Sequence, residues 1–309
     1  MRNSIARGLP LSILVVLILS FAACAAVPHI GEEEMGFGKD AAKEVESEHK
    51  ILNDEALLAR VQAIGTPIAV EANNIEVEAC YGSSDIVTFP YTFKIIDDDD
   101  VNAFSVPGGH IYVFKGLIEN CQSDHELAGV IAHEIVHAAH HHTIHLMREQ
   151  SKMEGKMAIL LVAGLVSNVN PRDMSNVIAG AQFYKTARIN GYGQRAEEDA
   201  DLVALTYMKR AGYNPVGTLT FLERLAERPE VIDWGILQTH PRPGDRVRIV
   251  HECLESEGVE INRRAVTTWS TARVKQVADL VTHGTKPQNY GRVHPRNGPP
   301  VSLVPNNEC

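Results

Sequence analysis

The feature that most constrains this chain of 309 residues is the run HEIVH at residues 133–137. In a helix, side chains four positions apart lie on one face, so His133 and His137 can aim two imidazole rings at a single metal ion. Glu134 projects beside them and can reach a water molecule next to that ion. The run therefore predicts a metal site on a helix, and zinc is the ion that this ligand pattern favours.

The residues around this run have the pattern of a helix. Ser123 followed by Glu126 is a capping box, and apolar residues then recur with helical spacing. We predict a helix that begins near Ser123 and continues to about Arg148. Further histidines follow within it, namely His140, His141, His142 and His145. The two at positions 140 and 141 would share a face with the second motif histidine and could compete for the metal, but a solvated helix end is the simpler interpretation.

A catalytic zinc site takes three protein ligands and keeps one position open, so a third ligand must come from elsewhere. Lys156 and Met157 stand where the thermolysin pattern places a glutamate, and the metzincin pattern also fails. Glu197 and Asp201 lie four positions apart on a predicted helix at residues 194–211. We therefore expect Glu197 to bind the metal and Asp201 to accept a hydrogen bond from a ligand histidine, which fixes its tautomer.

The order of these motifs resembles the M48 family of zinc peptidases, in which HExxH is followed by ExxAD. The resemblance covers roughly residues 30–254. Further segments are similar to family motifs: NAFSVPGGHI at 102–111, GLI at 116–118, and THP at 239–241 with Arg246 downstream. Together, the ordered motifs are specific.

The resemblance implies an α+β, zincin-like metallopeptidase. Such a fold is mainly helical, with a small mixed sheet whose edge strand lies over the catalytic helix. The resemblance implies one Zn²⁺ per chain, with His133, His137 and Glu197 as ligands. It also implies that Glu134 is the catalytic base and that Asp201 is the supporting aspartate.

Two further roles follow from the resemblance. The segment Asn102, Ala103 and Phe104 would belong to the edge strand, to which a polypeptide substrate can add as an extra strand. A purely structural strand is the alternative. His240 is the candidate donor to the oxyanion; it could instead fill the open zinc position, or be a plain surface histidine.

The N-terminus has the pattern of an export signal. A basic start precedes an apolar run at residues 9–21, which is shorter than the roughly 20 residues of a membrane span. We predict a signal peptide at residues 1–23. The box FAAC resembles the end of bacterial lipoprotein signals, which implies lipidation of Cys24, and Ala25 implies sorting to the outer membrane. The alternative is that Cys24 is removed with the signal.

The remaining sequence sets the domain organisation. We expect a peptidase domain at residues 24–256 and a partly loose C-terminal extension at 257–309. Export to an oxidising compartment allows three disulfide pairings among Cys80, Cys121, Cys253 and Cys309. The formal net charge of −10 argues against non-specific binding of nucleic acid, which needs a positive face.

Other elements follow from local patterns. We predict helices over 31–65, 215–228, 243–256 and near 267–282, strands within 86–116, and a solvated acidic turn at 97–100. The apolar run at 157–166 is too short to span a bilayer, so we expect a core helix, with a flap over the site as the alternative.

The resemblance implies a zinc-dependent endopeptidase of the bacterial cell envelope that cleaves misfolded or stalled proteins. Its partners would be unfolded or misassembled envelope proteins, with the membrane reached through the lipid anchor. One alternative is a chaperone or assembly factor with little proteolysis, and another is a processing peptidase with a single partner. An intact Glu134 favours the enzyme.

Overall fold

The structure of the chain is a computed structural model, and it describes residues 29–149, 151–152, 193–227, 234–240 and 243–268. Several predicted features lie outside these residues: the signal at 1–23, Cys24, the apolar run at 157–166 and most of the C-terminal extension. In the described part of that extension, α12 spans Arg263–Thr268.

The chain divides into two compact units, Met1–Pro28 with Leu146–Ile189, and His29–His145 with Asn190–Cys309. Nearly all described residues belong to the second unit, to which all further description refers. No described helix is both long and apolar enough to cross a lipid bilayer.

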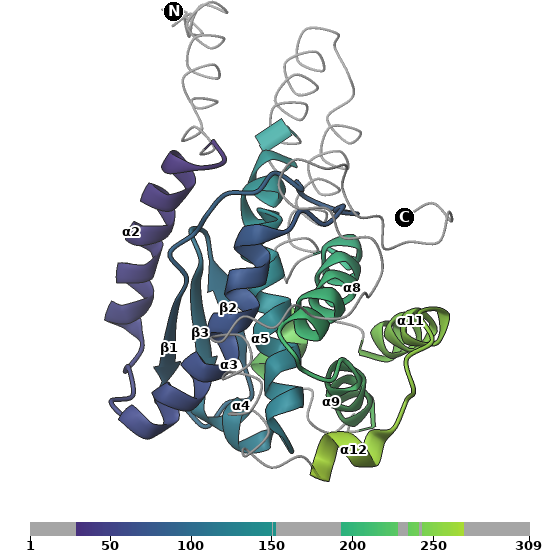
Figure 1. Cartoon of the computed structure of the whole chain (residues 1–309). Helices are drawn as coiled ribbons and strands as arrows, with labels where there is room; N and C mark the ends of the chain where they lie inside the picture. The colour runs from purple at the N-terminus through teal and green to yellow at the C-terminus, as the bar shows by residue number, and fades with distance from the viewer. Residues whose placement is uncertain (1–28, 150, 153–192, 228–233, 241–242, 269–309) are drawn as a thin grey trace, which may run out of the picture. The chain divides into compact units, whose positions relative to one another are not determined.

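A small mixed sheet forms one layer of this unit (Figure 1). Its strands are β1 (Thr92–Ile96), β2 (Ala103–Val106) and β3 (His110–Phe114). The order is β1-β3-β2, with β3 parallel to β1 and antiparallel to β2. Gly108 and Gly109 make the turn between β2 and β3 with φ of 82° and 86°, a conformation that favours glycine. The strand β2 is therefore an edge strand, and the predicted α+β architecture is confirmed.

The helix α5 (Asp124–Ala139) lies at the centre of the unit (Figure 1). Its neighbours are β2, α3 (Glu55–Asn74), α8 (Gln194–Arg210) and α9 (Val216–Ala226). Every residue from His125 to Ala138 is buried, which explains why the sequence is apolar on all sides of this helix. Gly129 lets α9 approach closely, since a Cβ there would lie 2.7 Å from the Thr218 hydroxyl.

The helix α5 ends at Ala139, so the predicted continuous helix to Arg148 is wrong. His140 is the C-cap, His141 has a φ of 56°, and helical residues begin again at His142. The backbone carbonyl of His140 accepts a hydrogen bond from the Ser83 amide at 3.0 Å, which holds the turn from outside. As a result, the histidines after the motif do not continue the face of His137.

The region predicted to be helical over residues 31–65 is helical, and it contains two helices separated by a short break. α2 spans Glu32–Glu48, and α3 begins at Glu55 after an N-cap in which the Asp54 carboxylate accepts from the Leu57 amide. Between the two helices, Ile51 pairs with Ile96 at the end of β1.

Three further predicted helices are close to those observed, whereas the helix expected near 267–282 lies almost entirely outside the described residues. The helices expected at 194–211, 215–228 and 243–256 correspond to α8, α9 and α11 (Pro243–Ser256). Two short helices complete the described elements: α4 (Lys115–Asn120) and α10 (Gly235–Thr239). The acidic run at 97–100 is the connection from β1 towards β2, and Asp98 and Asp99 are exposed there.

Helix α10 is fastened to this connection by two hydrogen bonds. The Gly235 amide donates to the Asp100 carboxylate at 3.0 Å, and the Ile236 amide donates to the Val101 carbonyl at 3.1 Å. The end of α10 is therefore positioned by the residues that lead into β2.

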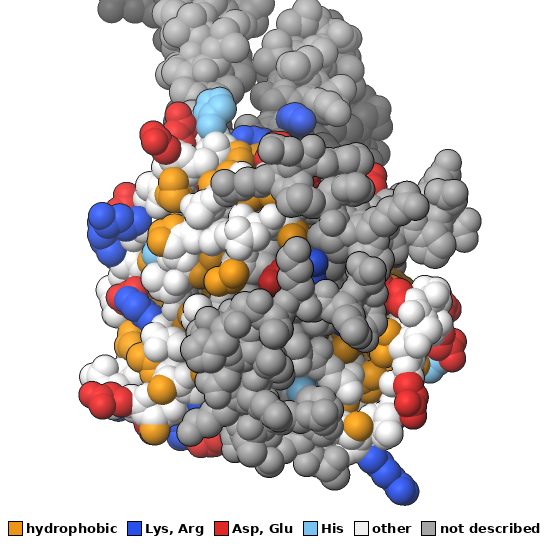
Figure 2. All heavy atoms as spheres, in the orientation of Figure 1, with side chains coloured by type: hydrophobic (Ala, Val, Ile, Leu, Met, Phe, Trp, Pro, Cys, Tyr) orange, Lys and Arg blue, Asp and Glu red, His pale blue; other side chains and the backbone are white. Residues whose placement is uncertain are grey.

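On the face shown in Figure 2, acidic and basic side chains of the described residues are interspersed, with apolar side chains scattered between them. Phe37 and Val70 are the large apolar side chains that are exposed within the described part of the chain. Most buried apolar residues form a core around α5, and a smaller cluster between α2 and the sheet consists of Ala42, Ile96, Tyr112 and Phe114.

Candidate metal centre

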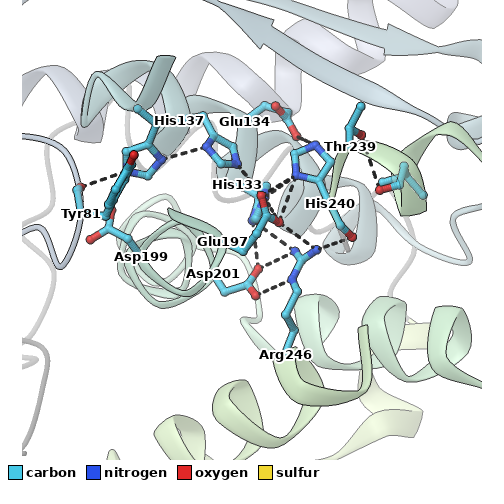
Figure 3. Close-up of polar contacts among 12 residues, drawn as sticks. Tyr81, His133, Glu134, His137, Glu197, Asp199, Asp201, Thr239, His240 and Arg246 are labelled. Carbon is cyan, nitrogen blue, oxygen red and sulfur yellow. Dashed lines mark hydrogen bonds and ion pairs between the residues drawn. The ribbon is translucent and has the colours of Figure 1, made fainter. Parts of the chain in front are cut away.

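Four buried side chains, from α5, from α8 and from the residue that follows α10, converge at α5 (Figure 3). His133 and His137 come from α5, Glu197 from the first turn of α8, and His240 directly follows α10. One nitrogen or oxygen of each lies within 4.8 Å of the others. We call these four residues the metal cluster.

The distances within the metal cluster are short. The Nε2 atoms of His133 and His137 are 3.0 Å apart, and the Glu197 carboxylate oxygens lie 3.5 Å and 3.6 Å from them. Nδ1 of His240 lies 3.2 Å from Nε2 of His133 and 3.0 Å from Glu197 Oε1. The sequence prediction named all four residues, and the structure brings them together.

The position of the hydrogen on the His133 ring shows why the metal cluster can bind a cation. Nδ1 of His133 is 2.9 Å from the Asp201 carboxylate, which only accepts, so in the neutral ring Nε2 carries a lone pair. That lone pair faces Nε2 of His137 and the Glu197 carboxylate. Acceptors that converge in this way repel one another unless a proton or a metal ion lies between them. Imidazole and carboxylate donors are those that bind zinc in proteins.

The charges around the metal cluster suit a cation. Burial and the Arg246 charge lower the pKa of His133, but the Asp201 and Glu197 hydrogen bonds outweigh them and raise the pKa to about 9. Burial and the His133 charge hold the pKa of His137 well below its ordinary value. Burial raises the pKa of Glu197, but the His240 and Arg246 charges hold it well below its usual range. The cluster therefore offers an ionised carboxylate and a neutral imidazole.

Asp201 is held in place by Arg246 of α11. The guanidinium donates to both carboxylate oxygens, from Nε at 2.7 Å and from Nη2 at 2.8 Å, and its Nη1 lies 3.1 Å from Glu197. Burial raises the pKa of Asp201, but the Arg246 charge and hydrogen bonds lower it more. The sequence analysis named Arg246 only as a residue downstream of the THP motif. The contact of Arg246 with Asp201 could not be predicted, because it depends on how α11 packs against α8.

Glu134 is buried beside the metal cluster, and neither of its carboxylate oxygens has a hydrogen-bond partner. Nε2 of His240 is 3.3 Å from its Oε1. Burial raises the pKa of Glu134, although the charges of His240 and His133 act in the opposite direction. A buried carboxylate with a raised pKa and unused oxygens is suited to take up a proton. The nearby Ser105 hydroxyl of β2 lowers the pKa of Glu134 and so opposes the effect of burial, and the sequence analysis did not identify this residue.

The predicted substrate strand is at the edge of the sheet. Ala103 and Phe104 belong to β2, which packs against α5, and Asn102 directly precedes them. The Asn102 carbonyl accepts from the Phe114 amide at 3.0 Å, so the antiparallel alternation directs the backbone of Phe104 towards β3. By the same alternation, the backbone groups of Ala103 and Ser105 face away from the sheet.

A narrow pocket adjoins His133, Glu134 and His240. Its apolar walls are Val130, Phe221, Leu222, Leu225 and Ile236. An apolar side chain could enter such a pocket.

None of the three described cysteines belongs to the metal cluster. Cys80 is disulfide-bonded, while Cys121 and Cys253 carry free thiols. Each of the three predicted pairings requires both of these cysteines in disulfides, so none of the three is made. Cys24 and Cys309 lie outside the described residues.

The model of peptidase family M48 matches residues 72–253 of this chain. The "Beta-barrel assembly-enhancing protease" of Yersinia pestis is 25% identical over 223 residues, which are 70% of this chain and 43% of that protein. The "Metalloprotease LoiP" of Escherichia coli (strain K12) is 26% identical over 178 residues, which are 55% of this chain and 66% of that protein. The "Mitochondrial metalloendopeptidase OMA1" of Schizosaccharomyces pombe is 26% identical over 229 residues, which are 74% of this chain and 63% of that protein.

The chain spans less than half of the length of the first of these relatives. The family model, in contrast, covers more than half of the chain and includes α5, α8 and His240. With the ordered motifs and the converging side chains of α5 and α8, this match places the chain in peptidase family M48.

Proposed function

We propose that this chain is a zinc-dependent endopeptidase with one Zn²⁺ held by His133, His137 and Glu197. The observation that carries the proposal is the convergence of the Nε2 atoms of His133 and His137 on the Glu197 carboxylate inside a buried cluster. Membership of a metallopeptidase family supports the same reading. When bound there, zinc would polarise the scissile carbonyl and lower the pKa of a water molecule.

Glu134 acts as the general base. It takes a proton from the attacking water and passes it to the leaving amine, and both steps need a carboxylate whose pKa lies closer to neutrality than usual. Burial raises the pKa of Glu134 in that direction. Asp201 supports the site by accepting from Nδ1 of His133 while Arg246 holds both of its oxygens. This arrangement keeps the lone pair of His133 directed at the metal cluster.

His240 is the proposed donor to the oxyanion of the tetrahedral intermediate. Its Nδ1 lies close to both His133 and Glu197, where a fourth ligand would be. That contact supports a second role, in which His240 fills the open position at rest and leaves it when substrate enters. A His240→Ala variant separates these roles, because loss of a plug speeds cleavage whereas loss of a donor slows it.

An extended polypeptide is the substrate that the edge strand supports. The outward backbone groups of Ala103 and Ser105 on β2 can pair with an added strand, which reads the backbone of the substrate more than its side chains. Such reading suits a peptidase that acts on unfolded chains. We infer that the natural substrates are misfolded or stalled envelope proteins, an inference supported by a relative named for the assembly of β-barrels.

The N-terminal pattern supports export to the periplasm and attachment to the outer membrane through a lipid on Cys24. A Cys24→Ser variant that is still exported would move from the membrane fraction to the soluble periplasmic fraction. If both proteins sediment equally with membranes, the anchor is elsewhere.

Casein digestion by the purified protein tests the enzymatic proposal. We expect zinc-dependent cleavage that a chelator stops, and a Glu134→Gln variant that retains its metal but cleaves about 10²–10⁴ times more slowly. Glu119→Gln is the matched control, because Glu119 is an exposed glutamate on α4. If the wild-type protein with full metal content cuts nothing but keeps an unfolded protein soluble, the chaperone alternative replaces this proposal.

A further inference from the structure

Beyond the metal cluster, a second group of buried histidines and a carboxylate lies against α5. It consists of His140, His142 and Asp199, whose side chains are 0–3% exposed, and we call it the Asp199 cluster. Oδ2 of Asp199 is 2.6 Å from Nδ1 of His140 and 3.1 Å from Nε2 of His142. Its Oδ1 accepts from the Cys80 amide.

A contact between two imidazole rings joins this cluster to the metal cluster. Nδ1 of His142 is 2.8 Å from Nδ1 of His137, on the side of the His137 ring away from the other cluster nitrogens. Figure 3 shows His137 between Nε2 of His133 on one side and the region of Tyr81 and Asp199 on the other. The contact arises because the chain turns at His141 after α5 and so brings His142 back towards the motif.

The acceptors around His142 fix where its proton lies. Its Nε2 faces the Tyr81 carbonyl at 3.1 Å and Oδ2 of Asp199, and both of these atoms only accept. Nε2 therefore carries the hydrogen, and in the neutral ring Nδ1 holds a lone pair. Nδ1–H of His137 donates to that lone pair, which leaves Nε2 of His137 as a lone pair facing the metal cluster. If His142 donated this hydrogen bond instead, the hydrogen of His137 would be on Nε2 and would point at the metal cluster.

The Asp199 cluster could in principle hold a second metal ion, since it offers two imidazoles and a carboxylate. A metal on Nε2 of His142 would displace the hydrogen to Nδ1, which would then donate to His137. Nε2 of His137 would in turn carry a hydrogen and be lost as a ligand. The one bond between His137 and His142 therefore makes two neighbouring metals incompatible while both rings are neutral. Each acceptor oxygen of Asp199 already faces an N–H donor.

We propose that His142 is a positioning residue that fixes the tautomer and the ring orientation of His137, and that Asp199 holds His142 in turn. The proposal rests on the proposed function, because it takes His137 as a metal ligand. Ligand histidines usually donate directly to a carboxylate or carbonyl, and here a second imidazole lies between the ligand and the carboxylate. His140 bonds to Asp199 but lies outside this line.

Zinc affinity, measured by competition with a chromogenic chelator, tests the proposal without any substrate. His142→Phe keeps a ring but removes the acceptor, and we expect zinc to bind about 10–100 times more weakly. His140→Phe is the matched control, because it removes an equally buried histidine from the same carboxylate; we expect its affinity to stay within about threefold of the wild type. In the Co²⁺-loaded proteins, the absorption bands should shift for His142→Phe and not for His140→Phe.

A second pair of variants keeps the test decisive if His142→Phe does not fold. An asparagine at 142 can place its Oδ1 where Nδ1 of His142 accepts, whereas a glutamine reaches towards Asp199 instead. We expect His142→Asn to bind zinc more tightly than His142→Gln. The opposite order would overturn the proposal, as would equal losses for His142→Phe and His140→Phe, because these would indicate packing alone.

Metal stoichiometry completes the test. One zinc per chain is expected, and a second equivalent that disappears in Asp199→Ala would make the Asp199 cluster a metal site and end the proposal. Casein cleavage is scored separately from affinity. A protein that shows the expected order of affinities but cleaves nothing would therefore contradict the proposed function while leaving the role of His142 standing.

Discussion

The metal cluster and the Asp199 cluster both combine histidines with one carboxylate and lie at the same two helices, α5 and α8, yet their hydrogen bonds are organised differently. In the metal cluster, the Nε2 atoms of His133 and His137 face each other and a carboxylate. In the Asp199 cluster, each acceptor oxygen faces an N–H donor. The first arrangement needs a cation and the second is complete without one. The direction of donors and acceptors, more than the residue types, therefore distinguishes a metal site from its support.

The largest expected effect concerns the charged support of the metal cluster. Arg246 is 8% exposed and bridges Asp201 and Glu197, so Arg246→Met leaves buried carboxylates without their cation. We expect a loss of about 3–5 kcal/mol in the free energy of unfolding of the metal-free protein, measured with urea. Arg248→Met on the same helix breaks only an exposed pair with Glu252 and should cost about 0.3–0.5 kcal/mol. Equal losses in the free energy of unfolding for Arg246→Met and Arg248→Met would show that burial does not strengthen the ion pairs of Arg246.

Zinc should stabilise the protein through the metal cluster alone. At a free zinc concentration of about 100 times Kd, binding adds about 2.7 kcal/mol, which raises Tm by roughly 5–10 °C. Glu197→Gln should remove most of this shift, whereas Glu198→Gln, at the next position of α8, should keep it. Differential scanning calorimetry with and without zinc measures both. The comparison between the clusters fails if Asp199→Asn abolishes the shift and Glu197→Gln does not.

The smallest expected effect is the response of the Asp199 cluster to acid. Burial raises the pKa of Asp199, but the charges and hydrogen bonds of His140 and His142 outweigh it and lower the pKa below its ordinary value. A folded-state pKa below the unfolded value of about 3.9 stabilises the fold above about pH 4, and this stability is lost as the pH falls further.

Asp199→Asn should therefore flatten the decline in the free energy of unfolding of the metal-free protein below pH 4. The slope should change by at most about 1.4 kcal/mol per pH unit. Urea titrations at several pH values measure the slope, with the exposed Asp245→Asn as the control. An unchanged slope in Asp199→Asn would mean that this carboxylate titrates as in the unfolded chain.

Local patterns predicted much of the metal cluster. The spacing of HEIVH and of EEDAD places side chains on single helix faces, and the Ser123 cap of α5 is observed, with its hydroxyl accepting from the Glu126 amide. The Glu126 carboxylate, however, accepts from Gln122 and pairs with Arg224, which lies far away in sequence. Sequence patterns of this kind predict which side chains share one face of a helix. They do not predict which distant residues contact that face, because those contacts depend on how the helices pack.

The Asp199 cluster was beyond prediction for a physical reason. No glycine or proline marks the end of α5, and His141 adopts a positive φ that residues other than glycine rarely take. Distant contacts hold this turn, including the buried pair between His141 and Glu34 of α2. The second helix start at Asp54 was different, because an aspartate before a helical pattern is an N-cap signal that the sequence did contain.

The hydrogen bonds from Gly235 and Ile236 to residues 100–101 link the entrance of β2 to the short helix that ends at His240. The polypeptide that we propose to dock along β2 would therefore lie next to the connection that anchors α10 and, through it, His240. The start of the edge strand and the helix that precedes His240 therefore depend on the same two hydrogen bonds.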